Sequence, residues 1–439
     1  MMIKAIASYI LYPLVERQQK RQISPKLARL RELAKQPPSA KKQISAQKLY
    51  ETVALAGRHV PYYRELFQQQ SFDPEKLKTD TRYLEDLPYL TKDILRSQGE
   101  RLLNEQISPD ALHVRKTGGS TGPSALIYYD QAALDWTAAA NLFVLEQAGK
   151  KRYMKEAHFS SRFADAIPYR DKLKESIKCI TLNRVNITTD TFDADALRAA
   201  IAVLKKERPY LVQGHPSTLY RLALQIEKDH ASPQRLFTVF ESTGEVLNSK
   251  QLQTISRVFQ CQICDRYGNA EFGVVAHTNA ANTQQLSVLT PIVWPETRPA
   301  IEDNQELVFT NLTNHAMPLI RYCTGDMGQL SYPSGQPVIT DIVGRVHDVV
   351  SIGDDVYPTH YIQDFLDRVG GIDEFQLEQQ SDGHLKLKLL LINDSDLDRI
   401  RHSIAERWNS GIEIECISAD DLKLQGWRNK FRHLVAPAN

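Results

Sequence analysis

A polar loop in the first third of the chain carries residue types that suit an anion. Residues Lys116–Ser124 combine three glycines with four hydroxyl side chains. Glycines let backbone N–H groups approach phosphate oxygens, and serine and threonine hydroxyls add further donors. The loop lacks the Gly-Lys-Ser/Thr ending of a P-loop. It is predicted to bind phosphate without that motif, and the alternative is an ordinary surface loop.

Two later loops bring carboxylates and an aromatic ring. One is Glu241–Glu245 and the other is Tyr267–Glu271. The face of Tyr267 suits a purine base. The Glu271 carboxylate suits Mg²⁺, which prefers one or two carboxylates together with phosphate oxygens. The alternatives are a core aromatic ring at Tyr267 and a solvated helix-capping carboxylate at Glu271.

A third acidic loop follows the segment Leu319–Tyr322. Asp326 in this loop could accept hydrogen bonds from two ribose hydroxyls, as acidic residues do in other nucleotide sites. The alternative is an ordinary turn aspartate. Arg321 and Arg345 flank the region and are candidates to meet phosphate or ribose oxygens.

The elements that must position these loops alternate between strand and helix. Each predicted strand in the middle of the chain ends at a polar loop, so the loops should converge at the carboxyl edge of a parallel sheet. The expected strands are 210–213, 236–240 and 261–266, and the expected helices are 218–228, capped by Ser217, and 248–259, which starts at Asn248.

Other elements surround this α/β unit. Asp130 is predicted to cap a helix over 131–148, and Leu27, Leu30 and Leu33 mark one face of an earlier helix. Antiparallel strands are expected at 306–310, 318–322 and 328–331. A small α+β unit follows, with helices near 359–369 and 396–408 and strands at 385–391 and 412–417.

Composition excludes several classes of protein. At 439 residues, two or more domains are expected. With 54 basic and 53 acidic residues, the chain has no charge pattern for nucleic acid or an anionic membrane. Five cysteines argue against a disulfide framework and for a reducing compartment, so a cytoplasmic protein is expected.

The first residues contain one apolar stretch, 5–15, which is too short to span a bilayer and includes Pro13. A docked N-terminal helix is favoured over peripheral membrane contact, and no signal peptide is expected. Cys261 and Cys264 are predicted to be core cysteines. On a strand they point to opposite faces, and only His277 is near to complete a zinc site.

The loops together resemble the adenylate-forming superfamily, and within it the branch of phenylacetate-CoA ligases and capsular polysaccharide biosynthesis proteins. The ordered set covers nearly the whole chain. The matching segments are Pro61–Leu66, Asp86–Lys92, Thr117–Gly122, Ser242–Glu245, Tyr267–Gly273, Met317–Gly328 and Gly344–Arg345.

The resemblance implies an α/β fold with parallel sheets, crossover helices and a small β-barrel-like part. It implies a large adenylation domain over 1–343, which binds ATP and the acid, and a small mobile α+β domain over 344–439. The residues expected to bind ATP or AMP are Thr117, Gly118, Gly119, Ser120, Thr121, Gly122, Gly244, Glu245, Tyr267, Gly268, Asn269, Asp326 and Arg345.

The same resemblance implies ATP-dependent formation of an acyl-AMP, followed by transfer to a thiol of CoA or a carrier protein. Lys430 and Glu271 would be catalytic, with Glu271 also holding Mg²⁺. The acid pocket is expected to include Phe163, His215 and Phe272, which suggests a modest, partly apolar acid.

Two departures from the family pattern leave alternatives open. Pro123 stands where a lysine is usual, and Ala270 stands where a threonine is usual. One alternative is an enzyme that transfers the acyl or adenylyl group to an amine or hydroxyl in polysaccharide or natural-product biosynthesis. The other is a degenerate nucleotide-binding protein without turnover.

Overall fold

The computed structural model describes most of the chain from residue 12 onward. The residues outside the description are 1–11, 117–124, 161–168, 189–193, 280–281, 301–304, 346–348, 353–354, 359–361, 363–364, 367–368, 381–383, 409–411, 419–420, 426–429, 432 and 436–439. The expected N-terminal helix and the phosphate loop 117–122 therefore lie outside the described residues.

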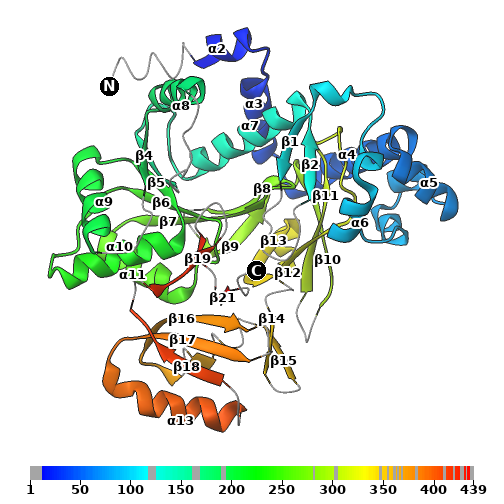
Figure 1. Cartoon of the computed structure of the whole chain (residues 1–439). Helices are drawn as coiled ribbons and strands as arrows, with labels where there is room; N and C mark the ends of the chain where they lie inside the picture. The colour runs from blue at the N-terminus through cyan, green and yellow to red at the C-terminus, as the bar shows by residue number, and fades with distance from the viewer. Residues whose placement is uncertain are drawn as a thin grey trace.

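Helices occur along the whole chain (Figure 1). The α-helices are α2 (Tyr12–Gln18), α3 (Ile23–Ala34), α4 (Pro38–His59), α5 (Pro61–Gln69), α6 (Lys92–Gln98), α7 (Gln131–Gln147), α8 (Tyr169–Leu182), α9 (Ala194–Glu207), α10 (Pro216–Lys228), α11 (Ser249–Phe259) and α13 (Leu397–Trp408). The 3₁₀ helices are η2 (Pro74–Lys78), η3 (Thr81–Asp86), η4 (Gly99–Leu102), η5 (Pro109–Ala111), η6 (Pro333–Gly335) and η7 (Asp394–Asp396).

The strands join into one long sheet and several small ones. Those of the long sheet are β3 (Glu156–Ser160), β4 (Arg184–Thr188), β5 (Leu211–Gly214), β6 (Val239–Thr243), β7 (Gln262–Asn269), β8 (Gly273–Asn279), β9 (Asn282–Val288), β10 (Val293–Pro299), β11 (Gln305–Asn311), β12 (Tyr322–Ser331) and β13 (Val338–Arg345). The others are β1 (His113–Lys116), β2 (Leu126–Tyr129), β14 (Val349–Ile352), β15 (Asp355–Pro358), β16 (Ile372–Gln379), β17 (Leu385–Leu391), β18 (Ile412–Cys416), β19 (Leu424–Gln425), β20 (Lys430–Phe431) and β21 (Leu434–Val435).

The long sheet has eleven strands in the order β10-β11-β12-β13-β9-β8-β7-β6-β5-β3-β4. Strands β4, β3, β5, β6 and β7 are parallel, and the pairing becomes antiparallel from β7 to β8. The predicted α/β fold class is thus confirmed. The antiparallel strands expected at 306–310 and 328–331 lie within β11 and β12, and they continue the same sheet through β13, β9 and β8.

Local capping explains why several helices begin where they do. The Asp130 side chain accepts from the backbone N–H of Ala133 at the start of α7, as the sequence predicts. Asn248 and Gln251 form a reciprocal capping box at the start of α11. Each cap satisfies donors that the first helical turn leaves without a partner.

Two expected strands differ from the structure. The strand expected at 236–240 runs instead over Val239–Thr243. No strand forms over 318–321, because Pro318 lacks a backbone donor and Arg321 has a left-handed φ of 53°. The Arg321 guanidinium bonds to the Glu296 carboxylate and to the Glu85 and Leu87 carbonyls. The Arg321 guanidinium thus bonds to other residues of the protein, whereas the sequence made it a candidate to meet phosphate or ribose oxygens.

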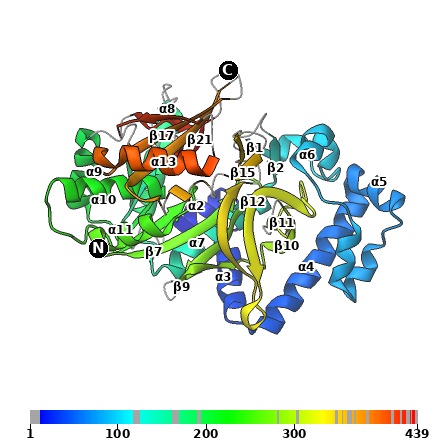
Figure 2. The ribbon, with the colours of Figure 1, turned by 90° about the horizontal axis from the view of Figure 1, so that it is seen from below.

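Separate hydrophobic clusters lie in different parts of the molecule. Helices α9, α10 and α11 cover one face of the parallel strands and form a core with Val212, Phe240 and Ile263. Leu27 and Leu30 of α3 belong to a larger core with the N-terminal helices. A third core, which includes Leu387 and Ile400, joins α13 to the C-terminal sheet β18-β17-β16-β21. Figure 2 shows this C-terminal unit beside α10 and α11.

Candidate active site

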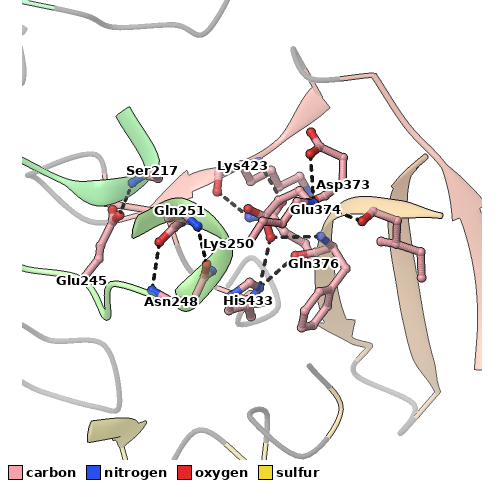
Figure 3. A network of polar contacts seen from close by, with 12 residues as sticks. Ser217, Glu245, Asn248, Lys250, Gln251, Asp373, Glu374, Gln376, Lys423 and His433 are labelled. Carbon is pink, nitrogen blue, oxygen red and sulfur yellow. Dashed lines mark hydrogen bonds and ion pairs between the residues drawn. The ribbon is translucent and has the colours of Figure 1, made fainter. Parts of the chain in front are cut away.

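Glu245 follows β6 and reaches the amino end of α10. Its Oε2 accepts from the backbone N–H of Ser217 at 3.2 Å (Figure 3). The sequence predicts Ser217 as the cap of a helix from Thr218, but α10 begins at Pro216 and its N-cap residue His215 makes no side-chain cap bond. The cap prediction is wrong because a carboxylate from the neighbouring strand end supplies the acceptor.

The end of strand β7 and strand β12 meet directly, so Tyr267 and Asp326 lie in strands and not in the loops expected from the sequence. The Tyr267 hydroxyl donates to Asp326 Oδ2 at 2.7 Å, although the two residues are 59 positions apart. Burial raises the pKa of Tyr267 well above its usual value, and the nearby Asp326 carboxylate adds to this rise. The Cα of Asp326 pairs with that of Arg345 across β12 and β13. Three predicted nucleotide contacts therefore lie together.

Glu271 is buried at the end of the β7 loop. Glu271 is only 8% exposed, and its Oε1 accepts a hydrogen bond from the Tyr322 hydroxyl at 3.1 Å. Tyr129 donates to the Ala270 carbonyl at 2.5 Å, which holds the loop from the other side. The arrangement offers one carboxylate, which fits Mg²⁺ carried on nucleotide phosphates.

The tight shape of this loop depends on glycine. A Cβ at Gly268 would lie 2.3 Å from the Gly273 carbonyl oxygen, so no larger residue fits without moving the backbone. The Asn269 side-chain oxygen accepts from the Phe272 backbone N–H at 3.0 Å. These contacts fix the turn between β7 and β8. Gly244 in the neighbouring loop also has a positive φ, of 85°.

Two of the residues predicted for the acid pocket lie in different surroundings. His215 Nδ1 is 2.9 Å from the Thr243 carbonyl oxygen and 3.9 Å from Glu245 Oε1, at the strand ends. Phe272 is 2% exposed, and its ring packs near Phe309 and Tyr322 in the core. The third, Phe163, lies outside the described residues.

Other predicted site residues can be placed only in part. Thr117, Gly118, Gly119, Ser120, Thr121 and Gly122 lie outside the described residues. Lys430 is in the short strand β20, which pairs with β19, and its side chain is outside the description, as is that of Arg345. Their roles stay predictions.

The two spaced cysteines are buried, as predicted. Burial raises the pKa of Cys261 to about 12 and that of Cys264 to about 11. Among the residues that the structure describes, no group of three or more His, Cys, Asp or Glu side chains could hold a metal ion.

Sequence reasoning missed a row of polar side chains just behind these loops. His158, Gln213 and Glu241 are register partners on three adjacent parallel strands, so they share one face of the sheet. Arg266, two positions beyond the partner of Glu241, extends the row toward the strand ends. The available signal was Glu241, a charged residue that directly follows the apolar pair Val239–Phe240.

Comparisons with known proteins agree with this architecture. No family model matches the chain. Protein CapK of Staphylococcus aureus is 22% identical over 367 residues, covering 82% of this chain and 80% of that protein. A phenylacetate-coenzyme A ligase of Thermus thermophilus is 25% identical over 382 residues, covering 79% and 83%. A 2-hydroxyisobutyryl-CoA ligase, solved in its postadenylation state with an acyl-AMP, has a TM-score of 0.68 at 16% identity and covers 92% and 90%.

The chain is similar in sequence to phenylacetate-coenzyme A ligases and to CapK, which supports the expected resemblance to the adenylate-forming superfamily. The relatives match most of their own length, so the shared region includes more than one motif. The Tyr267–Asp326 and Glu271–Tyr322 contacts join two of the segments that carry the sequence resemblance, Tyr267–Gly273 and Met317–Gly328. In the described part of the chain, no helix is both long and apolar enough to cross a membrane.

Proposed function

We propose that this chain uses ATP to activate a carboxylic acid as an acyl-adenylate and then transfers the acyl group to a thiol. The observation that carries the proposal is the meeting of Tyr267 with Asp326 at 2.7 Å, which joins two segments of the family pattern. The named relatives include phenylacetate-coenzyme A ligases, which supports CoA as the thiol. A carrier protein is the alternative acceptor.

Each loop has a proposed part in binding ATP. Tyr267 and Gly244 would border the adenine, and Asp326 and Arg345 would meet the ribose. Glu271 would hold Mg²⁺, which neutralises phosphate charge when it is bound. The phosphates would lie on the backbone and hydroxyls of Thr117–Gly122. Glu245, Gly268 and Asn269 would border the nucleotide.

The chemistry requires charge stabilisation more than covalent work by the protein. A carboxylate that attacks the α-phosphate builds negative charge there, and pyrophosphate leaves. We propose that Lys430 brings an ammonium to this charge from the C-terminal domain, 344–439. Movement about Gly344–Asp348 would then admit the thiol, because domain closure needs only a few hinge residues.

The first test is acid-dependent release of pyrophosphate from ATP across a carboxylic-acid panel, with and without CoA. Release with an acid alone is expected, and repeated turnover to AMP only with CoA. Turnover with an amine or alcohol acceptor instead would favour the alternative transfer. ATP binding without release for every acid would contradict the proposal and favour the degenerate protein.

A single substitution tests the proposed role of the lysine. Lys430→Ala is expected to slow acid-dependent pyrophosphate release by about 100-fold, because a positioned charge on the transition state is lost. Lys423→Ala, at an exposed lysine that pairs with Glu378 at 2.7 Å, is the matched control and should leave the rate close to that of the parent. An unchanged rate in Lys430→Ala would remove that role.

A further inference from the structure

The side of the parallel strands that faces α7 changes character along the strands. Leu211 and Val239 pack there with Leu145 and Ala148 from the end of α7. Two residues further along the same strands, on the same face, stand Gln213 and Glu241. The apolar packing thus gives way to polar side chains on approaching the nucleotide loops.

Glu241 is fully buried in this polar row. The Gln213 amide donates to its Oε2, while Arg266 Nη1 lies 3.6 Å from its Oε1. The Arg266 guanidinium donates instead to Asn141 Oδ1 of α7 at 3.0 Å and to Thr243 Oγ1 at 3.3 Å. Glu241 Oε1 accepts no hydrogen bond from any residue that the structure describes.

The neighbouring charged groups do not donate a hydrogen bond to Glu241 Oε1. Glu156 is held by Lys150 at 2.8 Å and Arg184 at 2.7 Å. His158 lies 3.3 Å from Glu156, and burial lowers the pKa of its imidazole, so the ring is neutral at pH 7. A buried carboxylate oxygen without a donor is costly. Glu241 therefore stands ready to accept a hydrogen bond from a ligand.

The position suits the acid and not the nucleotide. Glu241 is two residues before Thr243, and two residues span about 6.6 Å along a strand. Thr243 leads directly into Gly244 and Glu245, and Arg266 leads into Tyr267. If these loops hold the adenylate as proposed above, the tail of the acid points back along the face that carries Glu241.

We propose that the substrate is a carboxylic acid whose tail carries a hydrogen-bond donor, a hydroxyl or an amino group, received by Glu241 Oε1. This inference rests on the proposed function and narrows its substrate class. A hydrocarbon tail would leave Glu241 Oε1 with the 3.6 Å ion pair to Arg266 and no hydrogen bond. The partly apolar acid expected from the sequence would then also carry a hydrogen-bond donor.

The test compares acids that differ only in the donor. Pyrophosphate release is measured with butyrate, 4-hydroxybutyrate and 4-aminobutyrate, and with phenylacetate and 4-hydroxyphenylacetate. A donor-bearing acid is expected to exceed its hydrocarbon counterpart by roughly 100-fold in kcat/KM, since sites built for a hydrogen bond reject analogues that lack it. The hydroxyl and amino members separate the two donor types.

Two variants connect the preference to this residue. Glu241→Leu should reduce the kcat/KM ratio between donor-bearing and hydrocarbon acids to about 1. Glu241→Gln should lower this ratio more for the amino-substituted acid than for the hydroxy-substituted acid, because the substitution removes the negative charge. Glu16→Gln, at a buried glutamate that binds Ser24 far from the loops, is the control and should keep the parent's ratio. The ratio is taken within one preparation, so partial misfolding cancels.

Each outcome has a distinct meaning. Equal or better turnover of hydrocarbon acids by the parent protein would overturn the inference and leave the proposed acid activation standing. An unchanged ratio in Glu241→Leu would also overturn it. Silence with every acid despite ATP binding would overturn the proposed function, and the inference with it. The parent's panel alone decides the matter if a variant fails to fold.

Discussion

The two faces of the parallel strands differ in what they contribute. Toward α9, α10 and α11 the strands present Val212, Phe240 and Ile263, which form a continuous apolar core. Toward α7 they present Gln213 and Glu241, on the same strands and one residue away. One face therefore supplies hydrophobic stabilisation, and the other holds buried polar groups that folding alone does not favour.

The largest expected change in stability comes from truncating a side chain on the apolar face. Phe240→Ala removes a fully buried ring and should cost about 3–5 kcal/mol of unfolding free energy. The measurement is denaturant unfolding of the variant beside the parent. The acid preference of the folded fraction should not change, because Phe240 points away from α7. A loss below about 1 kcal/mol would show that this face is not the main source of stability.

A carboxyl group on the apolar face offers a sharper comparison. Asp265 pairs in register with Ser242, and burial raises its pKa to about 6 from an ordinary 3.8, although Ser242 and Arg266 oppose the rise. The folded protein then holds this proton more tightly than the unfolded chain between about pH 4 and pH 6. Stability from this group is present below about pH 4 and is lost as pH rises through 6.

Asp265→Asn should therefore remove a pH dependence. Between pH 4 and pH 7 the parent should lose up to about 3 kcal/mol relative to the variant, which has no ionisable group at this position. Denaturant unfolding of both proteins at pH 4, 5, 6 and 7 measures the difference. A difference that stays constant over this range would contradict the raised pKa.

The smallest effect is expected on the outer side of the same helices. There Tyr220 and Arg221 of α10 meet Asp373 of the C-terminal sheet at 2.8 and 3.0 Å. Lys250 of α11 meets the same carboxylate at 3.2 Å (Figure 3). Lys250 is 41% exposed, so Lys250→Met should cost only about 0–1 kcal/mol.

Arg221→Met is the matched comparison for this surface. Arg221 is only 6% exposed, and its loss leaves the Asp373 carboxylate without the more shielded of its two cationic partners. Thermal unfolding should show a larger decrease in Tm for Arg221→Met than for Lys250→Met. The reverse order would mean that exposure does not decide the strength of this contact.

Much of the fold could be predicted because its signals are local. Asp130 and Asn248 predict the first residues of two helices, and both are the N-caps of those helices, α7 and α11. Pro318 and Arg321 were placed in a strand because the run Leu319–Ile320 is apolar, but burial of that run needs no strand. A left-handed φ at a non-glycine residue has no reliable signal in sequence.

The candidate site could be predicted only as a set of motifs. Residue type and spacing single out Tyr267, Glu271 and Asp326 as candidates, yet the Tyr267–Asp326 and Glu271–Tyr322 contacts depend on strand order. The row His158, Gln213 and Glu241 was missed for the same reason, since its members come from strands far apart in the chain. Register between distant strands is a property of packing and cannot be read from one segment.

The contact between Glu245 and Ser217 reduces the attraction of the amino end of α10 for anions. The amino end of a helix carries partial positive charge and commonly attracts phosphate. Here the Glu245 carboxylate already occupies that position, 3.2 Å from the Ser217 backbone nitrogen. The protein thus supplies its own counter-ion, so free phosphate or sulfate gains little by approaching α10, and anion selectivity is left to the other loops.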